Sequence, residues 1–303
     1  MIILNISDED VGRRIDKIVR KNLSFCPLGE IFRLFRDKKI LFDGKKLKEN
    51  DRVAQIGEIH ILVNEDELRN KFAVKLENKS KSNLQIVYED ENLLVCDKPA
   101  TIATQPGKGI PVGASLIEIA QNYAEQKFTP HLAHRIDKDT SGLVLIAKSA
   151  DFLRKVQNIW NSPLLKKEYL ALCHNIFDKK TGKIESNLER QGLKMNVSES
   201  GGKNCVSHFK QLKEIENISL IAVEIETGRM HQIRTQFSHI KHCIVGDKKY
   251  GDLSLDKEIE EKFGVKINRL MLHSHKISFK LEKKNYSFEA PVPKEFLAFT
   301  NRK

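Results

Sequence analysis

The chain has 303 residues, of which 40% are hydrophobic, and it carries a formal net charge of +11 at pH 7. This length and composition are typical of a folded protein with one large core, or with one core and a small appendage, and they exclude a disordered chain. No apolar run approaches the roughly 18 residues of a membrane span, and the first ten residues lack the basic start and apolar centre of a signal peptide. We therefore expect a soluble cytoplasmic protein, and the basic excess favours a polyanionic partner, most simply nucleic acid.

The five cysteines are scattered along the chain, and no two stand at the Cys-x-x-Cys spacing of a zinc ribbon. This pattern predicts neither a metal site nor a disulfide framework, and it fits a reducing compartment in which each cysteine is a small buried hydrophobic residue. The five are Cys26, Cys96, Cys173, Cys205 and Cys243.

The pattern of residues 1–64 predicts a small separate module. Ser7, with Asp10 three residues later, marks a helix start, and apolar residues then recur at helical spacing up to residue 23. A second helix is predicted over residues 28–39, with its apolar side chains inward and its arginines outward. A short strand, an Asp43–Gly44 turn and another strand complete the module.

The order of these elements resembles an S4 RNA-binding domain, a fold that presents a basic helical face to structured RNA. Residues 13–52 hold 13 Lys or Arg residues and six Asp or Glu residues, which fits such a face. An ordinary solvated helix face remains the alternative. The resemblance implies that the RNA-binding residues of the module are Arg14, Lys17, Arg33 and Arg36.

Residues 65–83 are polar, lack an apolar period and end in a Lys/Ser/Asn cluster, so we predict a linker. From residue 84 onward, strand-like apolar runs alternate with helical patterns at 114–127, 150–161 and 229–240. Runs of strands with few helices are typical of an α+β domain. We therefore predict that residues 84–303 form a domain around a mixed, mainly antiparallel sheet flanked by helices.

The stretch "HLAHRIDKDTSGLVLIAKS", residues 131–149, passes from a cluster of charges directly into a buried strand pattern. Asp137 stands out as a carboxylate that opens this strand, although a structural ion pair with Arg135 is an equal alternative. Asp139 precedes a turn signal, which favours a turn-stabilising acceptor over the second carboxylate of a glycosidase. His131 and His134 of this stretch lack a third metal ligand nearby, so we predict no metal site.

Two further constellations are ambiguous by themselves. Lys167 and Tyr169 share one face of a strand, where a tyrosine can stack on a base while the cation meets a phosphate, but a core tyrosine fits equally. Arg229, His231 and Arg234 begin a helical pattern, and this group suits an anion or an acidic side chain.

The ordered motifs "HRIDKDTSG", "KKEYLAL", "TGRMHQIR" with "GDKKYG", "RLMLHSHKISF" and "FEAPVP" together resemble the RluA-type pseudouridine synthases. The resemblance covers about residues 84–297. Together with the S4-like module in front, the whole chain resembles the ribosomal large-subunit branch of that family. It implies isomerisation of uridine to pseudouridine in 23S ribosomal RNA or an assembling large subunit, without metal or nucleotide cofactor. A tRNA enzyme of the same family and a non-catalytic RNA-binding assembly factor are the alternatives. We expect a monomer because no spare amphipathic helix or heptad run is present.

The resemblance also implies roles for individual residues. Asp137 matches the catalytic aspartate, and Arg234 matches the arginine that pairs with its carboxylate and favours the charged form. Tyr169 matches the tyrosine that lines the uracil pocket, and Arg135 is implied to enter the RNA stack where the flipped base left it. Contacts with the RNA backbone are implied for Lys167 and Arg229.

Overall fold

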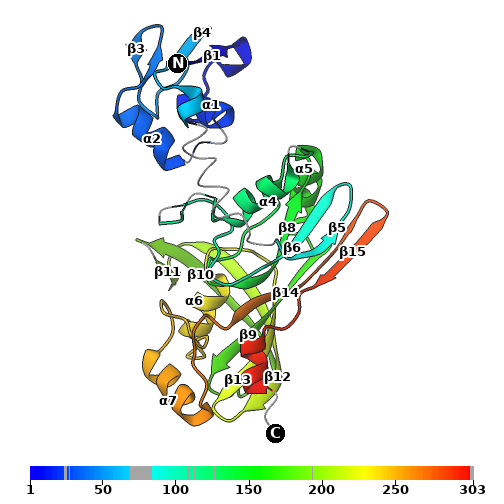
Figure 1. Cartoon of the computed structure of the whole chain (residues 1–303). Helices are drawn as coiled ribbons and strands as arrows, with labels where there is room; N and C mark the ends of the chain where they lie inside the picture. The colour runs from blue at the N-terminus through cyan, green and yellow to red at the C-terminus, as the bar shows by residue number, and fades with distance from the viewer. Residues whose placement is uncertain are drawn as a thin grey trace. The chain divides into compact units, whose positions relative to one another are not determined.

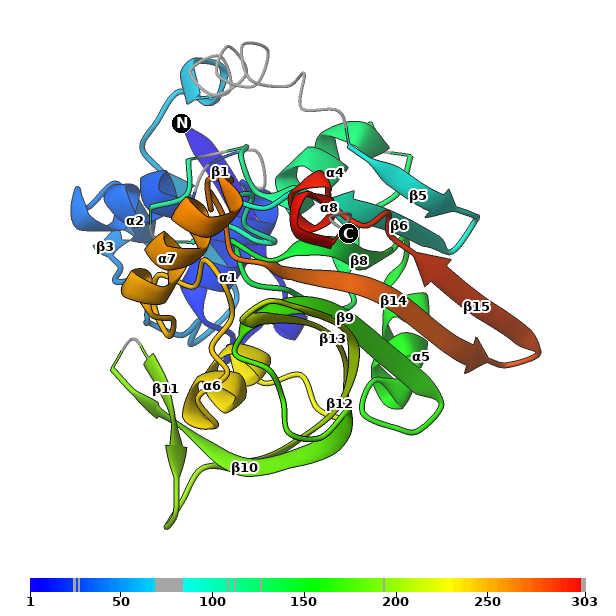
Figure 2. The same cartoon turned by 90° about the horizontal axis from the view of Figure 1, so that it is seen from below.

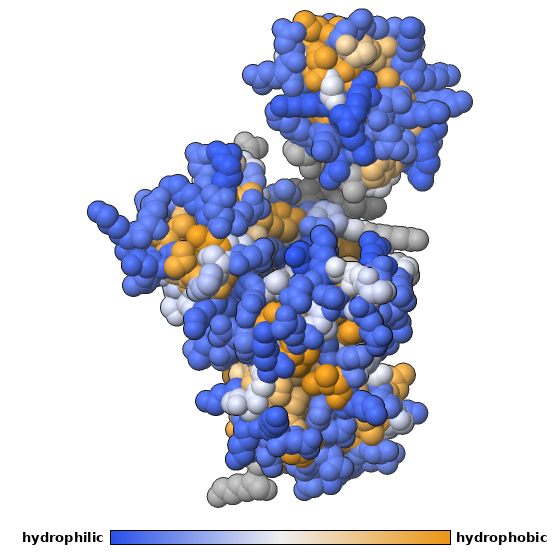
Figure 3. Space-filling model, turned by 180° about the vertical axis from the view of Figure 1, so that it is seen from behind, coloured by the Kyte–Doolittle hydropathy of each residue, from blue (hydrophilic) through white to orange (hydrophobic). Residues whose placement is uncertain are grey.

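The structure is a computed structural model (Figure 1) that describes residues 1–23, 26, 28–68, 84–107, 109–111, 113–125, 127–192 and 194–300. The chain divides into two compact units, Met1–Asn83 with Pro111–Gly113 and Leu84–Ile110 with Ala114–Lys303. Figure 3 shows a face on which hydrophilic residues predominate and hydrophobic residues gather in small groups. Across the described ranges, every helix is too short or too polar to cross a membrane.

The smaller unit contains, in its described part, a sheet with the order β1 (Ile2–Ile6), β4 (Gly57–Ile61), β2 (Ile40–Phe42) and β3 (Lys45–Lys46), in which every neighbouring pair is antiparallel. Helices α1 (Ile15–Asn22) and α2 (Leu28–Arg36) supply the other side chains of its core. The core thus joins both helices to the sheet, and its fully buried members include Ile15, Val19, Leu34, Ile40 and Ile59.

The turn in this unit agrees with the sequence-based prediction, whereas the start of its first helix and its first strand do not. Asp43 and Gly44 both have positive φ, as a two-residue hairpin turn requires. The first helix begins later than predicted, because residues 8–10 form a separate 3₁₀ turn, and strand β1 was not predicted. Residues 65–68 of the predicted linker are helical, and Leu68 is buried in this core; residues 69–83 of that linker lie outside the described residues.

The larger unit contains one mixed sheet, in which 11 strands are described. Its order is β11 (Lys194–Ser198), β10 (Thr181–Gln191), β12 (Lys203–Ile215), β13 (Ile218–Ile225), β9 (Leu165–His174), β14 (Leu272–Leu281), β8 (Ser141–Ala147), β6 (Leu93–Lys98) and β5 (Ile86–Glu89). Strand β15 (Lys284–Glu289) pairs with β14, and β7 (His131–Leu132) pairs with β8. Among these described pairs only β14 and β8 run parallel, so the predicted α+β class and mainly antiparallel sheet are confirmed.

Five labelled helices lie in the described part of the larger unit: α4 (Leu116–Ala124), α5 (Ala150–Ile159), α6 (Gln232–His239), α7 (Leu253–Phe263) and α8 (Lys294–Thr300). Strand β8 is buried along its whole length because both of its faces are covered. Leu143 and Leu145 pack in the cluster that contains α5 residues, whereas Val144 and Ile146 pack in the cluster that contains α4 residues. This two-sided burial explains the continuous apolar run after the charged stretch.

The strands at the other end of the sheet curve around α6, as Figure 2 shows for β9, β13, β12 and β10. Phe237 of α6 is fully buried and contacts Phe177 and Phe209 edge-on, at ring-centroid distances of 6.0 and 6.3 Å. This packing fixes α6 against the sheet and thereby sets the position of the polar residues at its N-terminal end.

Gly142 marks the point where β8 meets β14. Its φ is +106°, and a Cβ at this position would lie 2.2 Å from the carbonyl oxygen of Ser274. Only glycine permits both this backbone conformation and so close an approach. The close packing of Gly142 against Ser274 therefore fixes the end of the preceding loop beside β14.

Candidate active site

Asp137 lies in the loop between β7 and β8, and the backbone on both sides of it is held. Thr104 Oγ1 donates to the carbonyl oxygen of Ile136 at 2.7 Å and accepts from its N–H at 3.3 Å. Lys98 Nζ, which is fully buried, donates to the carbonyl oxygen of Lys138 at 3.0 Å. The carboxylate of Asp137 remains 24% exposed, so this anchored loop presents it to solvent.

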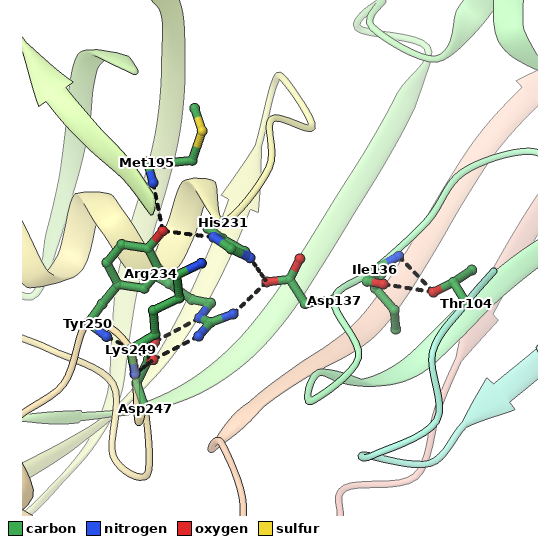
Figure 4. Close-up of polar contacts among 9 residues, drawn as sticks. All are labelled: Thr104, Ile136, Asp137, Met195, His231, Arg234, Asp247, Lys249 and Tyr250. Carbon is green, nitrogen blue, oxygen red and sulfur yellow. Dashed lines mark hydrogen bonds and ion pairs between the residues drawn. The ribbon is translucent and has the colours of Figure 1, made fainter. Parts of the chain in front are cut away.

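Arg234 joins this carboxylate to a second, deeper one (Figure 4). Its Nη1 donates to Asp137 Oδ2 at 2.9 Å, and its Nε and Nη2 donate to the two oxygens of Asp247 at 2.7 and 2.8 Å. Asp247 is 1% exposed, and its Oδ1 also accepts from the backbone N–H groups of Lys249 and Tyr250. The bidentate pair fixes the plane of the guanidinium and leaves one N–H directed at Asp137.

Burial and charge oppose each other in this pair. Burial alone would lower the pKa of the Arg234 guanidinium, but the hydrogen bonds and charges of Asp247 and Asp137 outweigh it and raise the pKa. Burial likewise favours a higher pKa for Asp247, but hydrogen bonds from Arg234, its charge and two backbone N–H groups lower it. Both partners are therefore charged at neutral pH, and Arg234 offers a fixed positive charge to Asp137.

His231 lies beside Asp137 and is in turn held by Tyr250. His231 Nε2 lies 3.8 Å from Asp137 Oδ2, and its Nδ1 lies 2.7 Å from the hydroxyl oxygen of Tyr250. That hydroxyl oxygen also accepts from the backbone N–H of Met195 in β11 at 2.8 Å. The ring of Tyr250 faces the Arg234 guanidinium, with 5.2 Å between Cζ and the ring centroid. The site is thus tied to the β10–β11 hairpin.

Tyr169 lies in β9 opposite Ser274 of β14 and is buried. Burial raises the pKa of its phenol and the negative charge of Asp137 acts in the same direction, whereas Ser274 opposes them, and the resulting pKa is about 12. The phenol is therefore neutral at neutral pH.

The predicted RNA contacts of the larger unit separate into two kinds. Arg135 and Arg229 are both exposed. Arg135 precedes Asp137 by two positions, and Arg229 precedes His231 by two positions. Asp137 pairs with Arg234, so the alternative of a structural pair with Arg135 is not realised. The structure corrects the predicted contact of Lys167 with the RNA backbone. Lys167 is 2% exposed, and its Nζ donates to the carbonyl oxygens of Trp160 and Glu226 at 2.9 and 3.2 Å. An ammonium used in this way does not reach an RNA phosphate.

The basic residues predicted for the smaller unit differ in how free their charges are. Lys17 and Arg36 are exposed. Arg33 is also exposed, but it bonds to Glu30 at 2.5 Å on the same helix. Arg14 bonds to Asp16 at 3.0 Å and to Asn50 at 2.6 Å.

Sequence reasoning assigned no role to Asp247, Tyr250 or Lys98, although the first two stand in the quoted stretch "GDKKYG". Asp247 follows Gly246, which has a φ of +76° and where a Cβ would lie 2.0 Å from the carbonyl oxygen of Arg269. An aspartate directly after an apolar run and a turn glycine was the available signal.

A separate cavity of about 610 Å³ lies between the β10–β11 hairpin and α6. Its lining includes Lys183, Glu185 and Gln236, whereas Asp137 and Arg234 do not line it. Gln236 is fully buried and its amide already bonds to Ile184, Ser186, Cys205 and Ser207. The chemistry of this cavity is therefore distinct from that of the Asp137 site.

Comparison with known proteins gives a consistent result. Residues 92–239 match the family model described as RNA pseudouridylate synthase. The ribosomal large subunit pseudouridine synthase C of Buchnera aphidicola subsp. Schizaphis graminum is 33% identical over 91% of this chain and 88% of its own length. The protein of that name from Escherichia coli is 29% identical with the same coverage. The structure of human RNA pseudouridylate synthase domain containing 4 shares the fold, with a TM-score of 0.61 at 21% identity over 77% of this chain and 95% of that one. Asp137, in the loop before β8, therefore lies within the matched region, and the chain belongs to the RNA pseudouridylate synthase family.

Proposed function

We propose that this chain isomerises uridine to pseudouridine in large-subunit ribosomal RNA, with Asp137 as its catalytic carboxylate. The observation that carries the proposal is the pairing of a partly exposed Asp137 with Arg234, which Asp247 holds from behind. The ribosomal substrate is supported by relatives that carry the name ribosomal large subunit pseudouridine synthase C and align over most of both chains. We further propose that the enzyme acts as a monomer in the cytoplasm, where that RNA is made.

The reaction requires a carboxylate that is ionised at neutral pH. It breaks the bond between N1 of uracil and C1′ of ribose, turns the base, and joins C5 to C1′; a proton leaves C5 and a proton is taken up at N1. Asp137 either attacks C1′ or removes the proton from C2′ to begin this sequence. Arg234 Nη1, 2.9 Å from Oδ2, holds the carboxylate in a fixed direction.

The target base must leave its stack, which costs a few kcal/mol. Arg135 is exposed on the same loop as Asp137, which suits insertion into the gap left by the base. Tyr169 supplies a neutral aromatic surface near the carboxylate, which suits contact with an extruded uracil. Together these two residues offset part of the cost of extrusion.

We propose that the smaller unit is an S4-like RNA grip. Its two helices and short sheet carry Lys17 and Arg36 in exposed positions, and the chain as a whole is strongly basic. Exposed cations suit phosphate contacts, which add affinity without selecting a base. The choice of uridine is then left to the larger unit.

The proposal is tested by mapping pseudouridines in total RNA from cells with and without the gene, with a carbodiimide-dependent reverse-transcription stop. Loss of one or more sites in large-subunit ribosomal RNA, restored by the wild-type gene, is the expected result. Loss confined to tRNA would reassign the substrate within the same family. An unchanged map would overturn the proposed activity.

A further inference from the structure

His231 occupies an unusual backbone position beside the proposed catalytic carboxylate. It is the N-cap residue of α6, and its φ of 53° and ψ of 23° lie in the left-handed region. Residues other than glycine adopt this conformation less often, although histidine does so more readily than most. The conformation directs one edge of the imidazole toward Asp137 and the other toward Tyr250, as Figure 4 shows.

The hydrogen bonds around Tyr250 determine where the imidazole carries its proton. Met195 lies in β11, the edge strand of the described sheet, where it pairs with Arg190 of β10. Its backbone N–H donates to the hydroxyl oxygen of Tyr250 at 2.8 Å. Among the described residues the other hydrogen-bond partner of this hydroxyl is His231 Nδ1, at 2.7 Å, so the hydroxyl hydrogen finds an acceptor there when Nδ1 is unprotonated. Nδ1 is then the acceptor, so a neutral ring carries its proton on Nε2, which faces Asp137.

The surroundings keep this ring neutral. Burial lowers the pKa of His231, and the positive charges of Arg234 and Lys249 lower it further, while Asp137 and Asp247 act in the opposite direction. The net direction is downward. A neutral donor supports a carboxylate without neutralising its charge.

Both contacts with the carboxylate converge on one of its oxygens. Arg234 Nη1 lies 2.9 Å and His231 Nε2 lies 3.8 Å from Oδ2 of Asp137. A separation of 3.8 Å exceeds a hydrogen bond by about 1 Å. Hydrogen bonds between catalytic groups are often long in free enzymes and tighten in the complex with substrate. Both contacts are made to Oδ2, so neither Arg234 nor His231 bonds to Oδ1.

We propose that His231 is a positioning residue that, as the Nε2–H tautomer, donates to Oδ2 of Asp137 and so presents Oδ1 as the reacting oxygen. This role rests on the proposed catalytic function of Asp137. Tyr250 sets the tautomer, and its bond to Met195 fixes the hydroxyl in the orientation that does so.

The first test uses two substitutions of similar length. His231→Gln keeps an N–H donor near the place of Nε2, whereas His231→Met removes it; neither side chain is branched at Cβ, so both meet the same backbone strain. With unmodified transcribed large-subunit rRNA, we expect His231→Met to lower kcat about 10- to 100-fold with little change in KM, as for the misplacement of a reacting group. We expect His231→Gln to recover most of this loss. Equal activity of the two variants would overturn the role.

The second test reads the tautomer directly in the full-length wild-type protein. With ¹⁵N-labelled histidine, the chemical shifts of His231 should show a protonated Nε2 and an unprotonated Nδ1. Tyr250→Phe, which removes the hydroxyl donor, should shift the signal toward a mixture of tautomers. A wild-type ring protonated on Nδ1, or on both nitrogens, at neutral pH would overturn the assignment even if the His231 variants fold poorly.

Asp137→Asn separates the two levels of the argument. If Asp137→Asn is inactive while the Gln and Met variants of His231 behave alike, the positioning role fails and the proposed function stands. Turnover by Asp137→Asn would remove the basis of both.

Discussion

The charges of the larger unit's site and those of the smaller unit's helices behave in opposite ways. Arg234 is 6% exposed and shares its guanidinium between two carboxylates, whereas Arg36 is exposed on α2. Buried ionic groups interact strongly and depend on every partner, because removal of one leaves another uncompensated. Exposed ones are screened by salt and act almost independently. From this difference we expect catalysis to depend on a few coupled groups and RNA affinity to be a sum of small contributions.

The largest effect is expected for Asp137→Asn. Since the amide is neither a nucleophile nor a base, kcat should fall at least ~10³-fold, while the dissociation constant for RNA stays within about twofold. Single-turnover kinetics and filter binding on one transcript measure both quantities. Asp139→Asn, an exposed neighbour in the same loop, is the matched control and should retain activity. Substantial turnover by Asp137→Asn would remove the proposed catalytic group.

The coupling of buried charges is tested by Asp247→Asn. The change leaves Arg234 without its bidentate partner, and the free energy of unfolding should fall by about 3 kcal/mol with a large drop in kcat. Urea denaturation and steady-state kinetics give the two values. Glu216→Gln breaks the exposed pair with Lys262 and should cost less than about 1 kcal/mol. Equal costs for the two variants would contradict the distinction between buried and exposed pairs.

The pH dependence of stability follows from the same group. The pKa of Asp247 is lowered in the fold, so its contribution is fully present above the unfolded-state value of about 3.9 and is lost as the pH falls through the folded-state pKa. Wild-type stability should therefore decline more steeply below pH 4 than that of Asp247→Asn. Parallel curves from urea titrations between pH 2.5 and pH 6, a range of about one to two units on each side of that value, would show that Asp247 contributes nothing through its charge.

A moderate effect is expected in the smaller unit for the double variant Lys17→Ala/Arg36→Ala. Each lost phosphate contact should lower the slope of log affinity against log salt by about 0.7–0.9, with kcat at saturating RNA unchanged. Lys257→Ala/Lys280→Ala, which removes two exposed lysines of the larger unit, keeps net charge matched. If both double variants shift the slope equally, the effect is one of net charge, and the smaller unit is not a specific grip.

The smallest effect separates two arginines on one helix. Arg33 is paired with Glu30, whereas Arg36 is exposed beyond that pair, so Arg33→Ala should weaken RNA binding less than Arg36→Ala. The difference should be a few tenths of a kcal/mol, as for a surface ion pair. Binding measured at low and high salt resolves it, because the difference should vanish as salt increases. A larger loss for Arg33→Ala would mean that Glu30 orients this arginine toward RNA.

Apolar periodicity carried much of the fold. Strands β8, β9 and β13 were predicted because their buried runs are continuous, and α4, α5 and α6 because their patterns repeat at helical spacing. Strands β10 and β12 were not predicted, since their exposed faces carry many charges and polar residues that conceal the alternation. Strand register and the curvature around α6 depend on contacts between distant segments, which no local pattern encodes.

The site divides in the same way. Asp137 and Arg234 were found through motif order, and the structure brings them within hydrogen-bond distance. Asp247 and Lys167 could not be judged, because a buried charged residue and an exposed one look alike in a sequence. Only the fold shows that Asp247 faces a guanidinium and that Lys167 faces two backbone carbonyl groups.

The bidentate clasp between Asp247 and Arg234 is complete before any RNA arrives. The loss of conformational entropy that comes with ordering this arginine therefore occurs during folding, and it does not weaken substrate binding. A uridine that reaches this site should meet a carboxylate whose direction is already set. Its rate of reaction should then also depend on how readily that nucleotide leaves its stack.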